Sequence, residues 1–397
     1  MLSTGLFKEF IASERSGAFV LMFATAGSLL LANTLFGESL QHFFHSSVFG
    51  MPIEKWVNDG LMVIFFLMIG LELEREIYEG ELSSWRNAAL PVIAAVGGMV
   101  VPAAIHILMN LGTATMRGAG IPMATDIAFS LGVLALCGSR VPYSLKVFLT
   151  ALAIADDLGA ILVIALFYTK EVALTYLLGA FGVLLFLGYL NRLRVQLLWP
   201  FVIGGVAMWW CFLQSGVHAT IGGVLLAFAI PFSKRREDCI SHRLQHRLHY
   251  PVALGILPIF AIVNTCIPLH GDWYWRLLEP NSLGIYLALV VGKPLGIIAF
   301  CFLAIHYRFG QLPDALSRVH VIGAGILAGI GFTMSIFIST LAFDDHDLID
   351  MSQISVLLAS ATAAILGTGF FLAFVPKATA TDIDPPIDDM TLSDATN

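Results

Sequence analysis

Two adjacent aspartates, Asp156 and Asp157, lie within an apolar stretch that runs from Ala151 to Tyr168. The stretch is long enough to cross a bilayer as a helix, which takes roughly 17–25 residues. A charged side chain at that depth costs about 2.5–3.5 kcal/mol even on the mildest scale, and ionisable groups inside membranes usually mark ion or proton pathways. We therefore take the two aspartates as candidates for a functional site. The alternative is that one carboxylate is merely satisfied by backbone or by a basic partner.

The composition of the whole chain is that of a polytopic membrane protein. Of its 397 residues, 58% are hydrophobic and 12% are charged, whereas soluble domains carry about 25% charged residues. No basic patch interleaved with aromatic residues points to nucleic acid as a partner. We expect a single transmembrane domain over residues 1–375, surrounded by lipid, and an acidic, disordered, cytoplasmic tail over residues 376–397.

The distribution of apolar residues predicts an all-α fold with about twelve transmembrane helices. The apolar stretches fall near 10–34, 57–73, 89–110, 121–138, 147–168, 174–190, 198–213, 216–232, 250–268, 283–305, 320–343 and 351–375. With a cytoplasmic N-terminus, sixteen of the 21 Lys and Arg residues fall on the inner side, four fall outside, and Lys293 lies within a span. This asymmetry predicts an even number of spans with both termini in the cytoplasm.

Two of the predicted spans carry features that interrupt a helix. In the fourth, Asp126 follows Pro122 and a glycine-containing segment, and proline breaks helical hydrogen bonding. In the eleventh, four glycines lie close together, which indicates either close helix packing or a second break: Gly323, Gly325, Gly329 and Gly331. Spans 3–5 and 10–12 start on opposite sides of the membrane. They therefore predict an inverted repeat with discontinuous helices 4 and 11, a transporter pattern.

Lys293 lies about ten residues into the tenth predicted span, too deep for its ammonium group to reach water easily. An unpaired ammonium group in that position would tend to lose its proton. A nearby aspartate, or the carbonyl groups at a helix C-terminus, would hold the charge. Where two interrupted helices face each other with their N-termini, the ends carry partial positive charge, and the carboxylate of Asp126 would compensate it. The same carboxylate would also serve as an ordinary N-cap.

Six motifs, in this order along the chain, resemble those of the NhaA sodium/proton antiporters. They are Gly-Leu-Glu72 with Arg75-Glu76, Ala-Thr125-Asp126-Ile-Ala-Phe, Ala-Asp156-Asp157-Leu-Gly, Ser-Gly-Val-His218-Ala-Thr, Gly-Lys293-Pro-Leu-Gly and Gly-Ile-Gly-Phe-Thr333-Met-Ser-Ile-Phe. The resemblance implies that Asp157 is the main Na⁺ ligand and that Asp156 is a second titrating carboxylate able to pair with Lys293. It also implies that Thr125 and Asp126 are the broken-helix residues.

The resemblance further implies a pH-regulated homodimer in a bacterial inner membrane. Candidate pH-responsive residues at the inner face are Glu72, Arg75, Glu76, His246 and His249, with His218 near the outer side as a weaker candidate. Two positions depart from the family pattern, since Gln245 stands where an acid is expected and Glu74 where a base is common. The outer loop near Gly50 is the expected dimer contact, either as a β-hairpin or as an ordinary loop.

The chemistry of the residues is consistent with exchange of cytoplasmic Na⁺ (or Li⁺) for external H⁺, with no cofactor and no enzymatic reaction. Asp157, aided by Thr125 and freed backbone carbonyls, offers the oxygen ligands that a hard cation prefers. Desolvation and a like-charged neighbour favour protonation of the same carboxylates, so protons and Na⁺ compete for them. If the two carboxylates exchange two protons for one Na⁺, each cycle moves net charge across the membrane, and the exchange is electrogenic. The main alternative is a sodium-coupled symporter of an organic anion; membrane enzymes and passive channels fit the motifs poorly.

Overall fold

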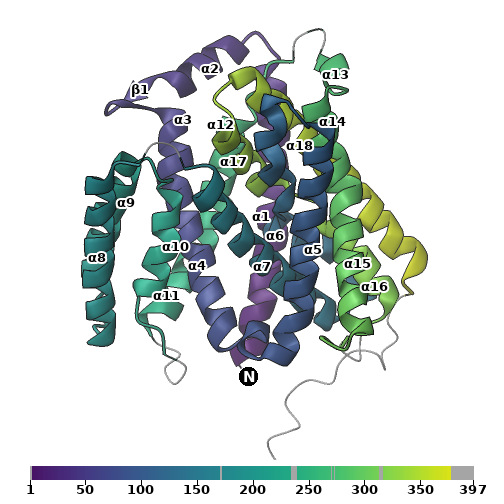
Figure 1. The fold of residues 1–397 in the computed structure, drawn as a ribbon, viewed down its shortest axis with the longest axis horizontal. Coiled ribbons are helices and arrows are strands. Elements are labelled where there is room, and N and C mark those ends of the chain that lie inside the picture. The colour runs from purple at the N-terminus through teal and green to yellow at the C-terminus, as the bar shows by residue number, and fades with distance from the viewer. Residues whose placement is uncertain are drawn as a thin grey trace, which may run out of the picture.

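The structure is a computed structural model that describes residues 2–169, 172–233, 239–269, 271, 273–312 and 316–376. Helices account for nearly all of the described chain, and most of them run side by side along one direction (Figure 1). Residues 377–397 of the expected acidic tail lie outside the described residues, so the disorder of the tail stays a prediction.

The helices follow the predicted apolar stretches. The first half of the chain contains α1 (Leu2–Ala32), α2 (Gly37–His45), β1 (Ser47–Val48), β2 (Met51–Pro52), α3 (Ile53–Lys55), α4 (Met62–Tyr78), α5 (Trp85–Met109), the 3₁₀ helix η3 (Ala114–Met123), α6 (Ile127–Leu136), α7 (Tyr143–Phe167) and α8 (Leu174–Arg192). The second half contains α9 (Leu198–Ser215), α10 (Thr220–Ala229), α11 (Ile240–Pro251), α12 (Leu257–Asn264), α13 (Trp273–Arg276), α14 (Pro280–Leu287), α15 (Lys293–His306), α16 (Arg318–Ala328), α17 (Phe332–Ala342) and α18 (His346–Phe374). Short 3₁₀ turns cover Glu81–Ser83 and Gly138–Arg140.

Among the described residues, eight helical segments are long and apolar enough to cross a membrane, and three bent helix pairs raise the number to as many as eleven. Each of the twelve predicted stretches coincides with one of these segments or pairs, except 216–232. That stretch forms α10, which has only ten residues. The class of a polytopic helical membrane protein is therefore confirmed, whereas twelve spans and the inverted repeat stay predictions.

Three long spans contain a π-helical turn, at Trp56–Leu61, Val252–Ile256 and Ala288–Gly292. In the last two, a proline follows closely, Pro258 and Pro294 respectively. A proline has no N–H to donate to the carbonyl four residues earlier. The hydrogen bonds of the turn just before the proline therefore depart from the α-helical pattern. The turn at Ala288–Gly292 directly precedes Lys293, and π-turns are frequent at functional sites.

Both predicted interruptions are present. The 3₁₀ helix η3 and α6 meet at 49°, and α16 and α17 meet at 43°. The breaks fall at residues 124–126 and 329–331. Gly329 also packs closely, because a Cβ there would lie 2.6 Å from the Leu289 carbonyl oxygen. Helix packing and a helix break, the two interpretations of the glycine series, therefore both apply.

Most buried side chains of the described helices fall into two clusters, and a small third cluster contains Ile267, Met351 and Ile354. Buried side chains of α8, α9 and α10 cluster with part of α4, and α8 and α9 form a layer at the left of Figure 1. The larger cluster takes in the interrupted helices and α5, α7, α12, α15 and α18. Most of the candidate site residues predicted from the sequence lie within this larger group, whereas His218 lies between α9 and α10, beside the smaller one.

The loop near Gly50 forms a β-hairpin, in which Ser47 pairs with Pro52 and Val48 pairs with Met51. The two turn residues, Phe49 and Gly50, both have positive φ angles of 51° and 84°, as a type I′ turn requires. The hairpin lies at the end of the bundle opposite the N-terminus (Figure 1). The hairpin form of the prediction is confirmed, and its role in a dimer stays a prediction.

Candidate functional site

The two interrupted helices meet at their breaks near the middle of the larger helix group. The backbone N–H of Asp126 donates to the carbonyl oxygen of Ile330 at 2.8 Å, so the two unwound segments lie against each other. Hydroxyl groups reinforce this contact in both directions: Ser130 donates to the Leu327 carbonyl oxygen at 3.2 Å, and Ser335 donates to the Ile121 carbonyl oxygen at 2.6 Å. Each interrupted helix thus supplies a hydroxyl donor to a carbonyl group close to the break in the other helix.

Asp126 joins the N-termini of two helices. Its Oδ1 accepts from the backbone N–H of Phe129 at 2.9 Å, which is an N-cap on α6. Its Oδ2 accepts from the backbone N–H of Thr333 at 3.0 Å and from the hydroxyl of Thr333 at 2.5 Å, at the start of α17. Both interpretations of Asp126 made from the sequence are thus met by its contacts, because one carboxylate faces the positive ends of two helices.

Lys293 holds the second aspartate of the site. Its Nζ lies 3.0 Å from Oδ2 of Asp156, and both side chains are fully buried. The same Nζ donates to the carbonyl oxygen of Met123, at the end of η3. Thr125 donates its hydroxyl to Asp156 Oδ2 at 2.7 Å and also approaches the Ala328 carbonyl oxygen at 3.2 Å. A buried ammonium group is thus balanced by a carboxylate and by a helix C-terminus, the two partners expected from the sequence.

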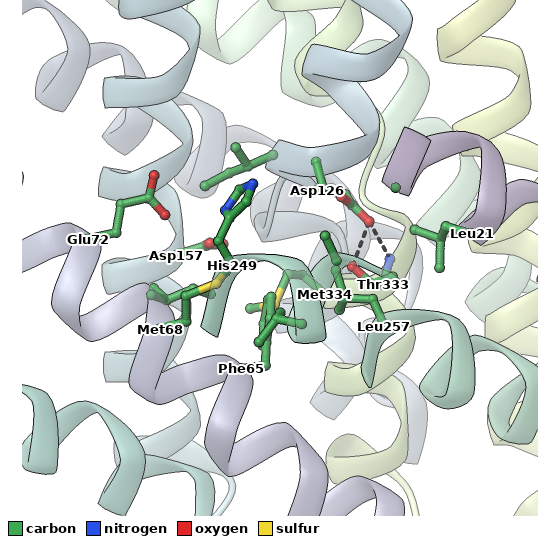
Figure 2. Close-up of a pocket in the computed structure, with 16 residues that line it drawn as sticks. Leu21, Phe65, Met68, Glu72, Asp126, Asp157, His249, Leu257, Thr333 and Met334 are labelled. Atoms are coloured by element: carbon green, nitrogen blue, oxygen red, sulfur yellow. Dashed lines mark hydrogen bonds between the residues drawn. The ribbon is translucent and has the colours of Figure 1, made fainter. Parts of the chain in front are cut away.

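Asp157 lies next to a cavity. It is only 1% exposed, and its Oδ1 has no hydrogen-bond partner among the described residues. The cavity is lined by Asp157, Asp126 and Thr333, together with Glu72, His249 and apolar residues of α1, α4 and α12. Figure 2 shows Glu72, Asp157 and His249 on one side of this space and Asp126, bonded to Thr333, on the other. Asp157 is therefore the aspartate of the pair that lines the space a cation could enter.

The sequence-predicted residues divide into those at this cavity and those away from it. Of the pH candidates, Glu72 and His249 line the cavity. Arg75 and His246 are exposed, and Glu76 accepts from the backbone N–H of Glu81 at 3.1 Å.

Two further residues noted in the sequence lie outside the cavity as well. His218 lies 2.9 Å from the Tyr168 carbonyl oxygen. Glu74, which departs from the family pattern, is buried and accepts from the Ser241 hydroxyl at 3.3 Å.

Thr125 differs from its expected placement. The sequence suggested that it would assist Asp157, but its hydroxyl donates to Asp156. The reason is the break itself, because Thr125 lies in the unwound segment beside the C-terminus of α16. The supporting residues Ser130, Ser335 and Tyr168 were not predicted, since a single hydroxyl within an apolar run usually bonds to its own helix and gives no distinct signal.

Comparison with known proteins points in the same direction as the geometry. Residues 8–371 match a family model described as Na⁺/H⁺ antiporter 1. A relative from Cytophaga hutchinsonii named Na(+)/H(+) antiporter NhaA is 56% identical over 367 residues, covering 92% of this chain and 95% of the relative. One of the same name from Dechloromonas aromatica is 57% identical over 365 residues, covering 91% and 94%. The protein named Na(+)/H(+) antiporter NhaA 2 from Pseudomonas savastanoi pv. phaseolicola is 47% identical over 364 residues, covering 91% and 93%.

Proposed function

This chain belongs to the NhaA family of Na⁺/H⁺ antiporters, and we propose that it exports cytoplasmic Na⁺ (or Li⁺) in exchange for external H⁺. The exchange is electrogenic and takes place in a bacterial inner membrane, with both termini in the cytoplasm. Asp156 and Asp157 are the groups for which Na⁺ and protons compete. Members of this family are transporters, so the transport cycle involves no chemical conversion of a substrate.

The observation that carries the proposal is the contrast between the two neighbouring aspartates. Oδ2 of Asp156 is held by Lys293 and Thr125, and Asp156 does not line the cavity, whereas Asp157 does. Oδ1 of each aspartate has no hydrogen-bond partner among the described residues, so what distinguishes Asp157 is that its carboxylate faces the cavity. A carboxylate oxygen without a donor is suited to receive either a proton or a hard cation. Asp157, Asp126, Thr333 and Glu72 bring oxygen atoms to this cavity, and Na⁺ prefers oxygen ligands over the nitrogen of His249 or the sulfur of Met68 and Met334.

The ion pair explains how more than one proton could move for each Na⁺. In the described state, Lys293 pairs with Asp156. In the proton-loaded state that we propose, each of the two aspartates carries one proton and Asp156 is released from Lys293. Binding of one Na⁺ at Asp157 then releases both protons and lets Asp156 pair with Lys293 again, so the exchange of two protons for one Na⁺ moves net charge.

The crossing of the two interrupted helices supports alternating access. The contacts at the breaks are few and specific, and Asp126 and Lys293 neutralise the half-helix ends at opposite sides of the crossing. Such a site can face either side of the membrane when the surrounding helices shift, as in transporters built from inverted repeats. For pH regulation, Glu72 and His249 are the strongest candidates, because both line the route to Asp157.

The decisive experiment uses purified protein in proteoliposomes with a pH-sensitive dye. Asp157→Asn keeps the shape of the side chain and removes its charge, so we expect Na⁺-dependent proton flux to disappear. Asp347→Asn is the matched control, because the Asp347 side chain is 76% exposed and is not among the residues that line the cavity. Undiminished exchange by Asp157→Asn would refute the proposal.

The symporter alternative is tested in the same vesicles. An antiporter collapses an imposed pH gradient when Na⁺ is the only added solute, whereas a symporter also needs its organic anion. Electrogenicity is tested by adding valinomycin and K⁺: exchange that moves net charge runs faster when the membrane potential is released. A rate indifferent to valinomycin would show electroneutral exchange.

We also propose that the chain forms a homodimer through the hairpin β1–β2. The hairpin presents short strands with exposed backbone edges, and Phe49 at its tip is 94% exposed. Exposed strand edges pair readily with another copy.

A further inference from the structure

The first half of the first interrupted helix, η3, is held by four side chains, three from different helices and one from the residue that follows α7. Each of them bonds to the backbone of η3: His106 of α5 to the Thr115 carbonyl oxygen, Tyr168 after α7 to Arg117 and Gly120, Ser335 of α17 to Ile121, and Lys293 of α15 to Met123. A 3₁₀ helix has poorer hydrogen-bond geometry than an α-helix, and ten residues is long for one. η3 therefore depends on external support for its conformation.

Tyr168 makes the most specific of these contacts. Its phenol donates to the carbonyl oxygen of Arg117 at 2.7 Å and accepts from the backbone N–H of Gly120 at 3.1 Å. These two residues are three apart, the spacing of a 3₁₀ hydrogen bond, so the hydroxyl bridges one turn of the helix. Gly120 makes room for it, because a Cβ at this position would lie 2.5 Å from the phenol oxygen.

The position of Tyr168 connects this support to the ion site. Tyr168 directly follows α7, which carries both aspartates, and the side chain is only 2% exposed. Three residues beyond Gly120, η3 ends at Met123, whose carbonyl oxygen accepts from Lys293. We propose that Tyr168 is a positioning residue for ion exchange: its hydroxyl fixes η3 relative to α7 and so sets the Met123 carbonyl and Thr125 in place around Lys293 and Asp156.

The hydroxyl group can be tested separately from the rest of the residue. His218 lies 2.9 Å from the backbone carbonyl oxygen of Tyr168, an atom that Tyr168→Phe leaves unchanged, and the variant also keeps the buried ring. Loss of the hydroxyl frees the end of η3 to shift and weakens the arrangement that binds Na⁺. The hydroxyl makes two hydrogen bonds, and the net loss of one is typically worth a factor of about five. We therefore expect the apparent KM for Na⁺ to rise at least about five-fold. The maximal rate should stay within about two-fold of the unmodified protein.

The experiment is Na⁺-dependent proton flux in proteoliposomes, with the amount of folded protein measured by size-exclusion chromatography. Tyr189→Phe is the matched control, because Tyr189 lies in α8 and is 60% exposed. An unchanged KM in Tyr168→Phe would overturn the proposal, as would a loss of maximal rate with no change in KM, which is the result of a merely structural role.

A second pair of variants tests the same support from the other side of η3. His106→Leu removes the donor to Thr115, whereas His106→Gln can keep it through its side-chain amide. We expect the Leu variant to raise the KM for Na⁺ and the Gln variant to restore it toward the normal value; equal KM values would contradict the proposal. This pair decides the question if little folded Tyr168→Phe is recovered.

The inference rests on the proposed Na⁺/H⁺ exchange, and the two can fail separately. If the unmodified protein shows no Na⁺-dependent proton flux, the proposed function is wrong. If it exchanges normally and the Tyr168 and His106 variants do so with unchanged KM, only the role of Tyr168 is wrong.

Discussion

At the scale of single residues, we expect the loss of the ion pair between Lys293 and Asp156 to lower the stability of the protein most. Both side chains are fully buried, and their charged atoms are 3.0 Å apart. Removing one partner of a buried pair leaves an uncompensated charge, which costs about 3–5 kcal/mol. We therefore expect Lys293→Ala to lower the melting temperature of the protein in detergent clearly, as measured by differential scanning fluorimetry.

Two comparisons make this prediction specific. Lys55→Ala, at an exposed position on α3, should leave the melting temperature nearly unchanged. The double variant Lys293→Met with Asp156→Asn removes both charges, and replacing a buried pair by neutral groups is often harmless to stability. It should recover most of the lost stability. A double variant as unstable as Lys293→Ala would show that the lysine contributes through packing and not through charge.

Asp126 gives a second residue-scale prediction. Its two carboxylate oxygens accept three hydrogen bonds from the beginnings of α6 and α17. Asp126→Ala should destabilise the protein by about 1–3 kcal/mol for the donors left unpaired. Asp126→Asn keeps an acceptor oxygen and should lose less, so the order of melting temperatures is Asp, Asn, Ala. An equal loss in both variants would mean that charge alone matters at this position.

At the scale of elements, the contact between α5 and α15 sets the position of Lys293. The two helices approach at Gly97 and Gly296, where a Cβ added to Gly296 would lie 2.1 Å from the Gly97 carbonyl oxygen. Backbone cannot move aside cheaply, and overpacking of this kind typically costs about 1–3 kcal/mol. We expect Gly296→Ala to lower both the melting temperature and the rate of exchange.

The control for this variant is Gly182→Ala in α8, where an added Cβ meets nothing within 4 Å. Alanine favours a helix over glycine by about 1 kcal/mol, so this variant should be as stable as the unmodified protein or slightly more so. If Gly296→Ala matched Gly182→Ala in melting temperature and rate, the close approach of α5 and α15 would be unimportant for the site.

The elements also show which local features could be predicted from the sequence. The break near Asp126 was signalled by Pro122, and the break near Gly329 was signalled by its glycine series. The conformation of η3 was not, because a 3₁₀ helix and an α-helix have nearly the same residue preferences. Its form depends on side chains of α5, α15 and α17 and on Tyr168 after α7, and such long-range contacts leave no local pattern in a single sequence.

At the scale of the whole molecule, the apolar stretches were predictable because lipid forces every backbone polar group to be satisfied within a helix. That rule places the long segments well and fails at α10, which packs on α4 and α9 and has only ten residues. From the residues alone, a buried ammonium group must find an aspartate or a set of helix C-terminal carbonyls as its partner, and that the aspartate would be Asp156 was implied by family resemblance. That Asp157 and not Asp156 lines the cavity was implied only by family resemblance.

The assembly of two copies is the last property that belongs to this scale. The tip of β1–β2 is exposed, and its type I′ turn keeps the two strands in register, so the hairpin can pair with a copy at its free edge. We expect a variant in which residues 47–52 are replaced by a short Gly-Ser linker to elute as a monomer, with its mass measured by light scattering in detergent. The ion site lies in the larger helix group, away from the hairpin, so the monomer should retain Na⁺-dependent proton flux in vesicles.

Phe49→Ser, which changes the exposed tip and leaves the strands intact, should weaken the dimer less than the linker does. A linker variant that still elutes as a dimer would move the contact to another surface.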